Sequence, residues 1–117
     1  MIEIQCHCGN VRLRFQALPS AVRDCDCPIC NRLGALWADF HTEEISISTA
    51  EPTGVYRWSS EDYEMHHCQT CGCTTHYTNS PEQKDSNQKH AAHSDAEIGV
   101  NLRMLERKQL EQIPVAS

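Results

Sequence analysis

The segment Cys68-Gln69-Thr70-Cys71-Gly72 is the most informative stretch of this sequence. A C-x-x-C pair followed by glycine is typical of a metal-binding knuckle, because the amides of the tight turn point at the sulfur and glycine supplies a positive φ. Two cysteines this close in the chain form a strained disulfide with each other, but both sulfurs can bind one ion. The segment therefore predicts a turn built around a metal ion.

The other cysteines also occur in short clusters, namely Cys6, Cys8, Cys25, Cys27, Cys30 and Cys73. A secreted disulfide framework spreads its half-cystines along the chain and follows a signal peptide, whereas residues 1–6 lack the basic and apolar regions of such a peptide. We therefore expect metal ligation and a cytoplasmic protein. Tetrahedral thiolate sites favour zinc, and the spacings do not match those of iron–sulfur proteins.

The eight sulfurs can be divided between metal ions in two ways. Two closed four-cysteine sites would make the protein a structural module. One closed site, one site with three protein ligands and one spare thiol would leave a coordination position open to a substrate, as in catalytic zinc sites. The spacing alone does not decide between these two divisions.

Composition indicates a single zinc-binding domain over residues 1–117. Leu, Ile, Val and Phe make up only 21 of the 117 residues, which is close to the level at which apolar packing alone no longer supports a fold. The net charge of −6 and the scattered basic residues argue against nonspecific nucleic-acid binding. Because no apolar run approaches the ~20 residues of a transmembrane helix, we expect no membrane partner either.

The hydrophobic pattern predicts an all-β fold of small zinc-containing sheets, with short antiparallel strands, knuckle turns and little helix. Val11, Leu13 and Phe15 alternate with polar residues, and Gly9-Asn10 before them forms a hairpin turn. The expected strands cover residues 1–6, 11–15, 21–24, 35–40, 44–48, 55–58, 63–67, 74–77 and 98–102. One helical turn is expected at 28–32, where proline suits the first position, and weak helix at 103–112.

Residues 79–95 contain no Val, Ile, Leu or aromatic residue. A polar stretch of this length within a small domain is typical of a lid, a binding loop or a disordered segment. We therefore expect a long polar loop here.

The order of the cysteine clusters resembles that of the glutathione-dependent formaldehyde-activating enzyme family, which also includes centromere protein V. The similar segments are C-H-C-G-x-V-R at residues 6–12, C-x-C-x-x-C-x-R at 25–32 and C-x-x-C-G at 68–72. Thr75-His76 and Gly99-Val100-Asn101-Leu102 also look similar to the family. The resemblance covers roughly residues 3 to 106.

The resemblance implies two Zn²⁺ ions per chain. A structural zinc would bind Cys6, Cys8, Cys68 and Cys71, and a second zinc with an open position would bind Cys25, Cys27 and Cys30. The implied reaction is the reversible addition of glutathione to formaldehyde, giving S-hydroxymethylglutathione, which is a carbon–sulfur lyase reaction. The implied partner is a small-molecule thiol such as glutathione.

Three thiolates on zinc suit the binding of a thiol, which loses its proton there and remains nucleophilic. A further anionic sulfur calls for a nearby cation, and Arg32, two residues after Cys30, is the best-placed one. Arg32 could also bind a glutathione carboxylate, and the alternative is a solvated surface residue. His76 could donate a proton near the open zinc, and the alternative is a hydrogen-bonded structural histidine.

Several other residues have simpler expected roles. Cys73 is expected to pack as a small apolar residue, and His7 to point away from the metal. We expect His66, His90 and His93 to be exposed to solvent, and Trp37 and Trp58 to belong to the core. Two functions therefore stay open, namely a zinc enzyme acting on a thiol adduct and a non-catalytic binding module with two closed zinc sites.

Overall fold

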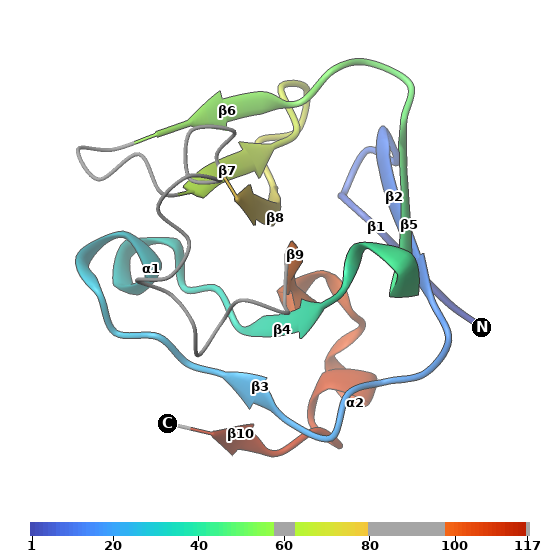
Figure 1. Cartoon of the computed structure of the whole chain (residues 1–117), viewed down its shortest axis with the longest axis vertical. Coiled ribbons are helices and arrows are strands. Elements are labelled where there is room, and N and C mark those ends of the chain that lie inside the picture. Colours follow the sequence, from blue (N-terminus) through green and yellow to red (C-terminus); the bar gives the residue numbers. More distant parts are fainter. Residues whose placement is uncertain (58–62, 80–97, 117) are drawn as a thin grey trace.

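The computed structural model describes residues 1–57, 63–79 and 98–116, whose strands form two sheets (Figure 1). The smaller sheet is antiparallel and has the order β1-β2-β5, with bounds β1 (Ile2–Gln5), β2 (Val11–Phe15) and β5 (Ile45–Thr49). Along β2, Val11, Leu13 and Phe15 are buried, while Arg12 and Arg14 are exposed. The predicted alternation therefore places one face of this sheet on the core.

The larger sheet of the described residues has the strand order β10-β3-β4-β9-β8-β7-β6. Its strands are β3 (Val22–Arg23), β4 (Trp37–Phe40), β6 (Gly54–Tyr56), β7 (Tyr63–His67), β8 (Thr74–Asn79), β9 (Ile98–Asn101) and β10 (Val115–Ala116). Neighbours are antiparallel, except that β10 runs parallel to β3. Figure 1 shows β10 and β3 at one edge of the sheet and β6 at the other.

Helical structure is limited to short segments in the part of the chain that the structure describes. The two α-helices are α1 (Pro28–Leu33) and α2 (Arg107–Leu110), and 3₁₀ turns occur at η1 (Thr42–Glu44) and η3 (Leu102–Met104). None of the described helices has the length and apolarity needed to span a membrane. The predicted all-β class with little helix is confirmed.

Two hydrophobic clusters hold the sheets together. The larger includes the fully buried Val22, Val100 and Leu102, and it also contains the sulfur-bearing Cys6 and Cys68. The smaller consists of Cys30, Ala35, Trp37 and Met65. Each cysteine group thus packs against its own part of the core.

Some sequence boundaries shift in the structure. The strand expected at 55–58 runs from Gly54 to Tyr56, and Trp58 lies outside the described residues. The strand expected at 21–24 is shortened to β3, and the weak helix at 103–112 is reduced to a 3₁₀ turn and α2. Of the polar stretch 79–95, Asn79 ends β8, and residues 80–95 lie outside the described residues.

Candidate metal centres and pocket

Four cysteine sulfurs from two distant segments of the sequence meet in one group. The Sγ atoms of Cys6, Cys8, Cys68 and Cys71 all lie within 4.8 Å of one another. The distance from Cys8 is 3.8 Å to the sulfur of Cys6 and 3.5 Å to that of Cys68. Sulfurs bound at about 2.3 Å to a tetrahedral zinc ion lie about 3.8 Å apart. The donor set of this first group therefore fits a zinc ion.

Two glycine turns bring these sulfurs into position. Gly9 and Gly72 have φ angles of 87° and 83°, in the left-handed region that favours glycine. Their amides donate to the carbonyl groups of Cys6 and Cys68, at 3.0 and 2.9 Å respectively. The amide of Thr70 also points at the sulfur of Cys68, at 3.4 Å. These contacts give the segment from Cys68 to Gly72 the knuckle form that its sequence predicts.

The amide groups of the turns control the ionisation of the sulfurs. The backbone N–H groups of Cys73 and Cys8 lower the pKa of the Cys71 thiol to about 5. The amide of Asn10 lowers the pKa of Cys8, but the neighbouring sulfur of Cys68 opposes it, and that pKa rises to about 11. Like charges at such short distances disfavour each other, and a bound cation removes this repulsion.

Two residues near the first group lie outside it. Cys73 is half-buried and packs against the larger hydrophobic cluster, and burial raises the pKa of its thiol. It therefore behaves as the small apolar residue expected from the sequence. His7 is exposed and does not belong to the group.

The second group contains three sulfurs, those of Cys25, Cys27 and Cys30, which lie within 4.8 Å of one another. The extended chain after β3 carries the first two, and the first turn of α1 carries the third. Pro28 begins this helix, and Gly34 ends it in the left-handed region with a φ of 67°. Among the described residues no fourth metal-binding side chain joins the group. Three sulfurs fit a zinc ion that keeps one position open.

Hydrogen bonds and burial set the pKa values of the thiols in the second group. The indole Nε1–H of Trp37 donates to the sulfur of Cys30 at 3.3 Å. This hydrogen bond lowers the pKa of the Cys30 thiol, but burial has the larger effect and raises that pKa to about 12. Burial also opposes ionisation of Cys27, but hydrogen bonds from the amide and thiol of Cys30, the thiol of Cys25 and the amide of Ile29 together outweigh it and lower the pKa of Cys27. The first turn of α1 therefore favours a thiolate at Cys27.

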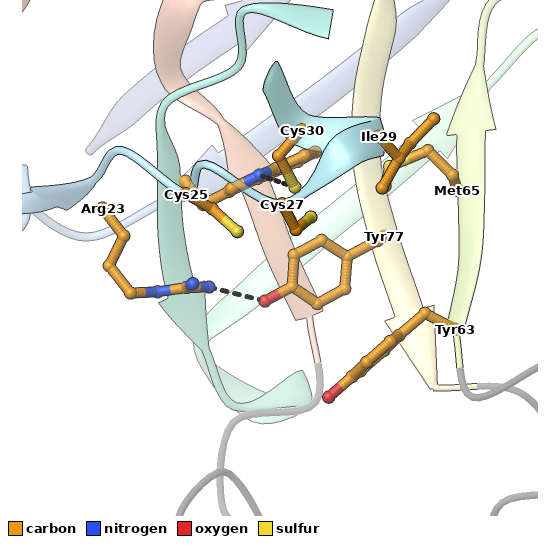
Figure 2. Close-up of a pocket in the computed structure, with 9 residues that line it drawn as sticks. Arg23, Cys25, Cys27, Ile29, Cys30, Tyr63, Met65 and Tyr77 are labelled. Carbon is orange, nitrogen blue, oxygen red and sulfur yellow. Dashed lines mark hydrogen bonds between the residues drawn. The ribbon is translucent and has the colours of Figure 1, made fainter. Parts of the chain in front are cut away.

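The three sulfurs open onto a cavity of about 140 Å³ (Figure 2). Its walls come from α1, the segment before it, and strands β3, β4, β7 and β8. The lining residues are Arg23, Cys25, Cys27, Ile29, Cys30, Trp37, Tyr63, Met65 and Tyr77. A small molecule in this cavity would therefore contact sulfur, aromatic rings and one guanidinium group.

A hydrogen-bonded trio forms one side of the cavity. Arg23 donates from Nε and Nη2 to the two carboxylate oxygens of Asp39, at 2.7 and 2.6 Å. Nη2 also donates to the hydroxyl of Tyr77 at 2.7 Å, and that hydroxyl donates to Asp39 at 2.9 Å. The ring of Tyr77 packs edge-on against Trp37 and Tyr63, with centroids 4.9 and 5.2 Å away. Burial raises the pKa of Tyr77, so its phenol stays protonated.

The family model of the glutathione-dependent formaldehyde-activating enzyme matches residues 1–102 of the chain. The chain belongs to this family. The match includes all eight cysteines and the residues that line the cavity. The resemblance inferred from the cysteine order is therefore confirmed.

A crystal structure of a Rhodobacter sphaeroides protein has a similar fold, with a TM-score of 0.70 and 27% sequence identity. The alignment covers 98% of this chain and 100% of that one. No curated protein matches the chain significantly. The likeness over the whole length supports the arrangement of both sheets.

Within this formaldehyde-activating family member, Arg32 does not line the cavity. It is exposed, and its Nη1 donates to the carbonyl of Pro28 at 2.9 Å, because side chains of a helix lean back toward the preceding turn. Among the described residues the cation that lines the cavity is Arg23, whereas Arg32 has the solvated position that the sequence left as the alternative. Alternate side chains of an extended chain share a side, so Arg23, Cys25 and Cys27 face the cavity together. This spacing was the signal in the sequence that could have identified Arg23.

His76 also lies away from the cavity. Tyr77, the next residue of β8, lines the cavity. Because neighbouring side chains of a strand face opposite sides of the sheet, His76 points away from it. His76 is 4% exposed, and its Nδ1 pairs with the hydroxyl of Thr75 at 2.8 Å. Burial lowers the pKa of His76 to about 3, so the ring stays neutral. It has the structural role that the sequence left as the alternative.

The expectation that His66 is exposed is wrong. Its ring stacks on that of His76 at a centroid distance of 4.3 Å, and its side chain is 15% exposed. Its two ring nitrogens pair with the hydroxyl groups of Thr53 and Thr78, at 2.8 and 3.1 Å. These contacts satisfy the ring within the sheet. Trp37 is a core residue as expected, while His90 and His93 lie outside the described residues.

Proposed function

We propose that this chain is a zinc-dependent enzyme that catalyses the reversible addition of a thiol to a small aldehyde. The family implies glutathione and formaldehyde as the substrates and S-hydroxymethylglutathione as the product. The observation that carries the proposal is the three-sulfur group, which faces a cavity instead of being closed by a fourth protein ligand among the described residues. An open coordination position is what distinguishes catalytic from structural zinc sites.

The two cysteine groups have different proposed roles. Cys6, Cys8, Cys68 and Cys71 would hold a structural zinc, because four protein sulfurs complete its tetrahedral shell. Cys25, Cys27 and Cys30 would hold the second zinc beside the cavity. When bound there, the ion supplies a positive centre that keeps a substrate thiol ionised and nucleophilic.

The side chains around the cavity prepare it for this chemistry. Trp37 fixes the orientation of Cys30 through its N–H group. Ile29 and Met65 add apolar walls, which exclude water from the reacting groups and strengthen electrostatic interactions there. Arg23 lines the same cavity, and its ion pair with Asp39 balances its charge. A thiol and a small aldehyde held together here would react faster, because binding brings the two reactants close to each other.

The alternative, a binding module with two closed zinc sites, requires a fourth ligand for the second group. The spare thiol, Cys73, packs against the cluster that contains Cys6 and Cys68. It is therefore placed beside the other metal group. This position favours the division into one closed and one open site.

Cadmium substitution tests the open site, because each thiolate ligand added to Cd²⁺ intensifies an ultraviolet charge-transfer band. Titration with glutathione should raise this absorbance in the wild type but not in Cys27→Ser. The matched control is Cys73→Ala, which removes a cysteine outside both groups and should respond as the wild type does. The zinc protein should also consume formaldehyde faster, with glutathione present, than free solution does at the same pH.

Two results would contradict the proposal. A protein whose spectrum responds to no thiol has no open thiol-binding position. Loss of one zinc equivalent in Cys73→Ala would show that this cysteine is a ligand and that the sulfurs are divided differently.

A further inference from the structure

The guanidinium of Arg23 is held in place by hydrogen bonds that involve only some of its N–H groups. Its Nε and Nη2 donate to Asp39 and Tyr77, and these contacts fix the plane of the group. Within the described ranges, no acceptor contacts the two N–H groups on Nη1. A rigid guanidinium that keeps two donors free beside a cavity is suited to binding an oxygen atom.

The charges around the cavity indicate which kind of oxygen fits. Three thiolates and one zinc ion give a net charge of about −1, and a bound substrate thiolate makes it about −2. Arg23 is the positively charged side chain that lines the cavity within the described part of the chain. Asp39 already balances its charge, so a permanent anion gains little there. An oxygen that becomes negative only during the reaction accepts stronger hydrogen bonds from the free N–H groups in the transition state than before it. Donors of this kind lower the activation free energy.

Resting on the proposed function, we infer that Arg23 binds the aldehyde oxygen during thiol addition and that Asp39 and Tyr77 position its guanidinium. The thiol first gives its proton to solvent. The electron pair of the thiolate then forms the carbon–sulfur bond, while the π pair of the carbonyl moves onto oxygen. The resulting alkoxide accepts N–H donation from Nη1 of Arg23 and takes a proton from water. The sum is one thiol plus one aldehyde giving one S-hydroxyalkyl product.

The layout of the cavity supports this assignment. Figure 2 shows the guanidinium of Arg23 and the sulfurs of Cys25 and Cys27 around the ring of Tyr77. Arg23 and Cys25 are two residues apart in extended chain, so their side chains project from the same side. The nucleophile would be held by the ion that the sulfur group would bind, and the oxygen by the guanidinium, with the reacting carbon between them.

Arg23→Met tests the inference through two separate measurements. Glutathione binding to the Cd²⁺ protein should be unchanged, because it depends on the sulfur group. The kcat for formaldehyde consumption by the zinc protein should fall by about 100-fold, the effect of losing an oxyanion donor in other enzymes. Metal content should stay at that of the wild type. The control is Arg14→Met, which removes a similar ion pair, with Glu3, on the smaller sheet and should change neither quantity.

Two further variants separate positioning from structure. Asp39→Asn keeps Arg23 but loosens its guanidinium, so kcat should fall less than in Arg23→Met while glutathione binding is unchanged. If Arg23→Met does not fold, Arg23→Lys keeps the charge but loses the fork and should still lower kcat at unchanged glutathione binding.

Three outcomes would overturn the inference. An unchanged kcat in Arg23→Met would show that the residue does not act on the reacting oxygen. Weaker binding of glutathione but not of mercaptoethanol, which lacks carboxylates, would assign Arg23 to a substrate carboxylate. If the wild type binds thiols but does not consume formaldehyde, the oxygen-binding role falls with the aldehyde reaction. A wild type that binds no thiol at all instead refutes the open site.

Discussion

The indole N–H of Trp37 donates a hydrogen bond of 3.3 Å to the sulfur of Cys30, and both side chains are buried. This contact ties β4 to α1. Trp37→Phe keeps an aromatic ring in the core but removes the donor. Loss of a hydrogen bond to a metal ligand lowers metal affinity by about 10–100-fold in other proteins. Chelator competition should show this loss at the second group, while the first group, in the same chain, keeps its affinity. Equal affinities in variant and wild type would contradict the prediction.

The two cysteine groups should differ in their importance for folding. Cys71→Ser should largely unfold the protein, because metal binding at a structural site contributes folding free energy of order 10 kcal/mol. Cys27→Ser should leave the fold mostly intact, since its group packs against the smaller hydrophobic cluster. Circular dichroism of both variants tests this difference. The same degree of unfolding in the two would refute the division of the sulfurs.

The ring of Tyr77 lies directly over Gly99, its partner on β9, and a Cβ at Gly99 would overlap that ring. Gly99→Ala should therefore displace Tyr77 and destabilise the protein by about 1–3 kcal/mol, as overpacking does elsewhere. In a Tyr77→Ala background the same change should cost much less. Urea unfolding of the four proteins in this double-mutant cycle measures the coupling. Additive effects would show that the overlap is relieved in some other way.

His76 should make the stability of the protein dependent on pH. Burial lowers its pKa from 6.5 to about 3 in the folded state, so at intermediate pH the unfolded chain binds one more proton. Stability from this group is therefore complete above about pH 6.5 and is lost as the pH falls toward 3. Between pH 6.5 and pH 5 the loss is about 2 kcal/mol.

The control for this pH effect is His76→Phe, which keeps a ring beside His66 but cannot titrate. Metal release and the titration of other groups affect both proteins. The difference in unfolding free energy between wild type and variant therefore reports the contribution of His76. A difference that stays constant from pH 7 to pH 5 would show that folding does not lower the pKa of His76.

The sequence predicts local geometry well in this protein. The knuckle at Cys68 and the hairpin at Gly9 are correct because each turn depends on residues within the turn itself. The alternation in β2 gives the buried face because strand side chains repeat every second residue. The family resemblance, and not the spacing alone, implies the three-sulfur group, whose members lie within six consecutive residues, Cys25 to Cys30.

Contacts between distant strands could not be predicted in this way. Asp39 meets Tyr77 only because β9 lies between β4 and β8 in the sheet, an order that no local pattern contains. Arg32 is close to Cys30 in sequence, but the direction of a helical side chain takes it to solvent. His66 is half-buried and stacks on His76, a contact that depends on the register of β7 and β8.

The sulfurs of Cys8 and Cys68 lie 3.5 Å apart although 60 positions separate them in the chain. A ribosome adds about 5–20 residues per second, so the first pair of cysteines is synthesised roughly 3–12 s before the second. During that interval Cys6 and Cys8, which only His7 separates, are two thiols without their partners. An oxidant or a competing thiophilic metal can react with them before Cys71 is made. The yield of native protein should therefore depend on the redox state around the nascent chain during these few seconds.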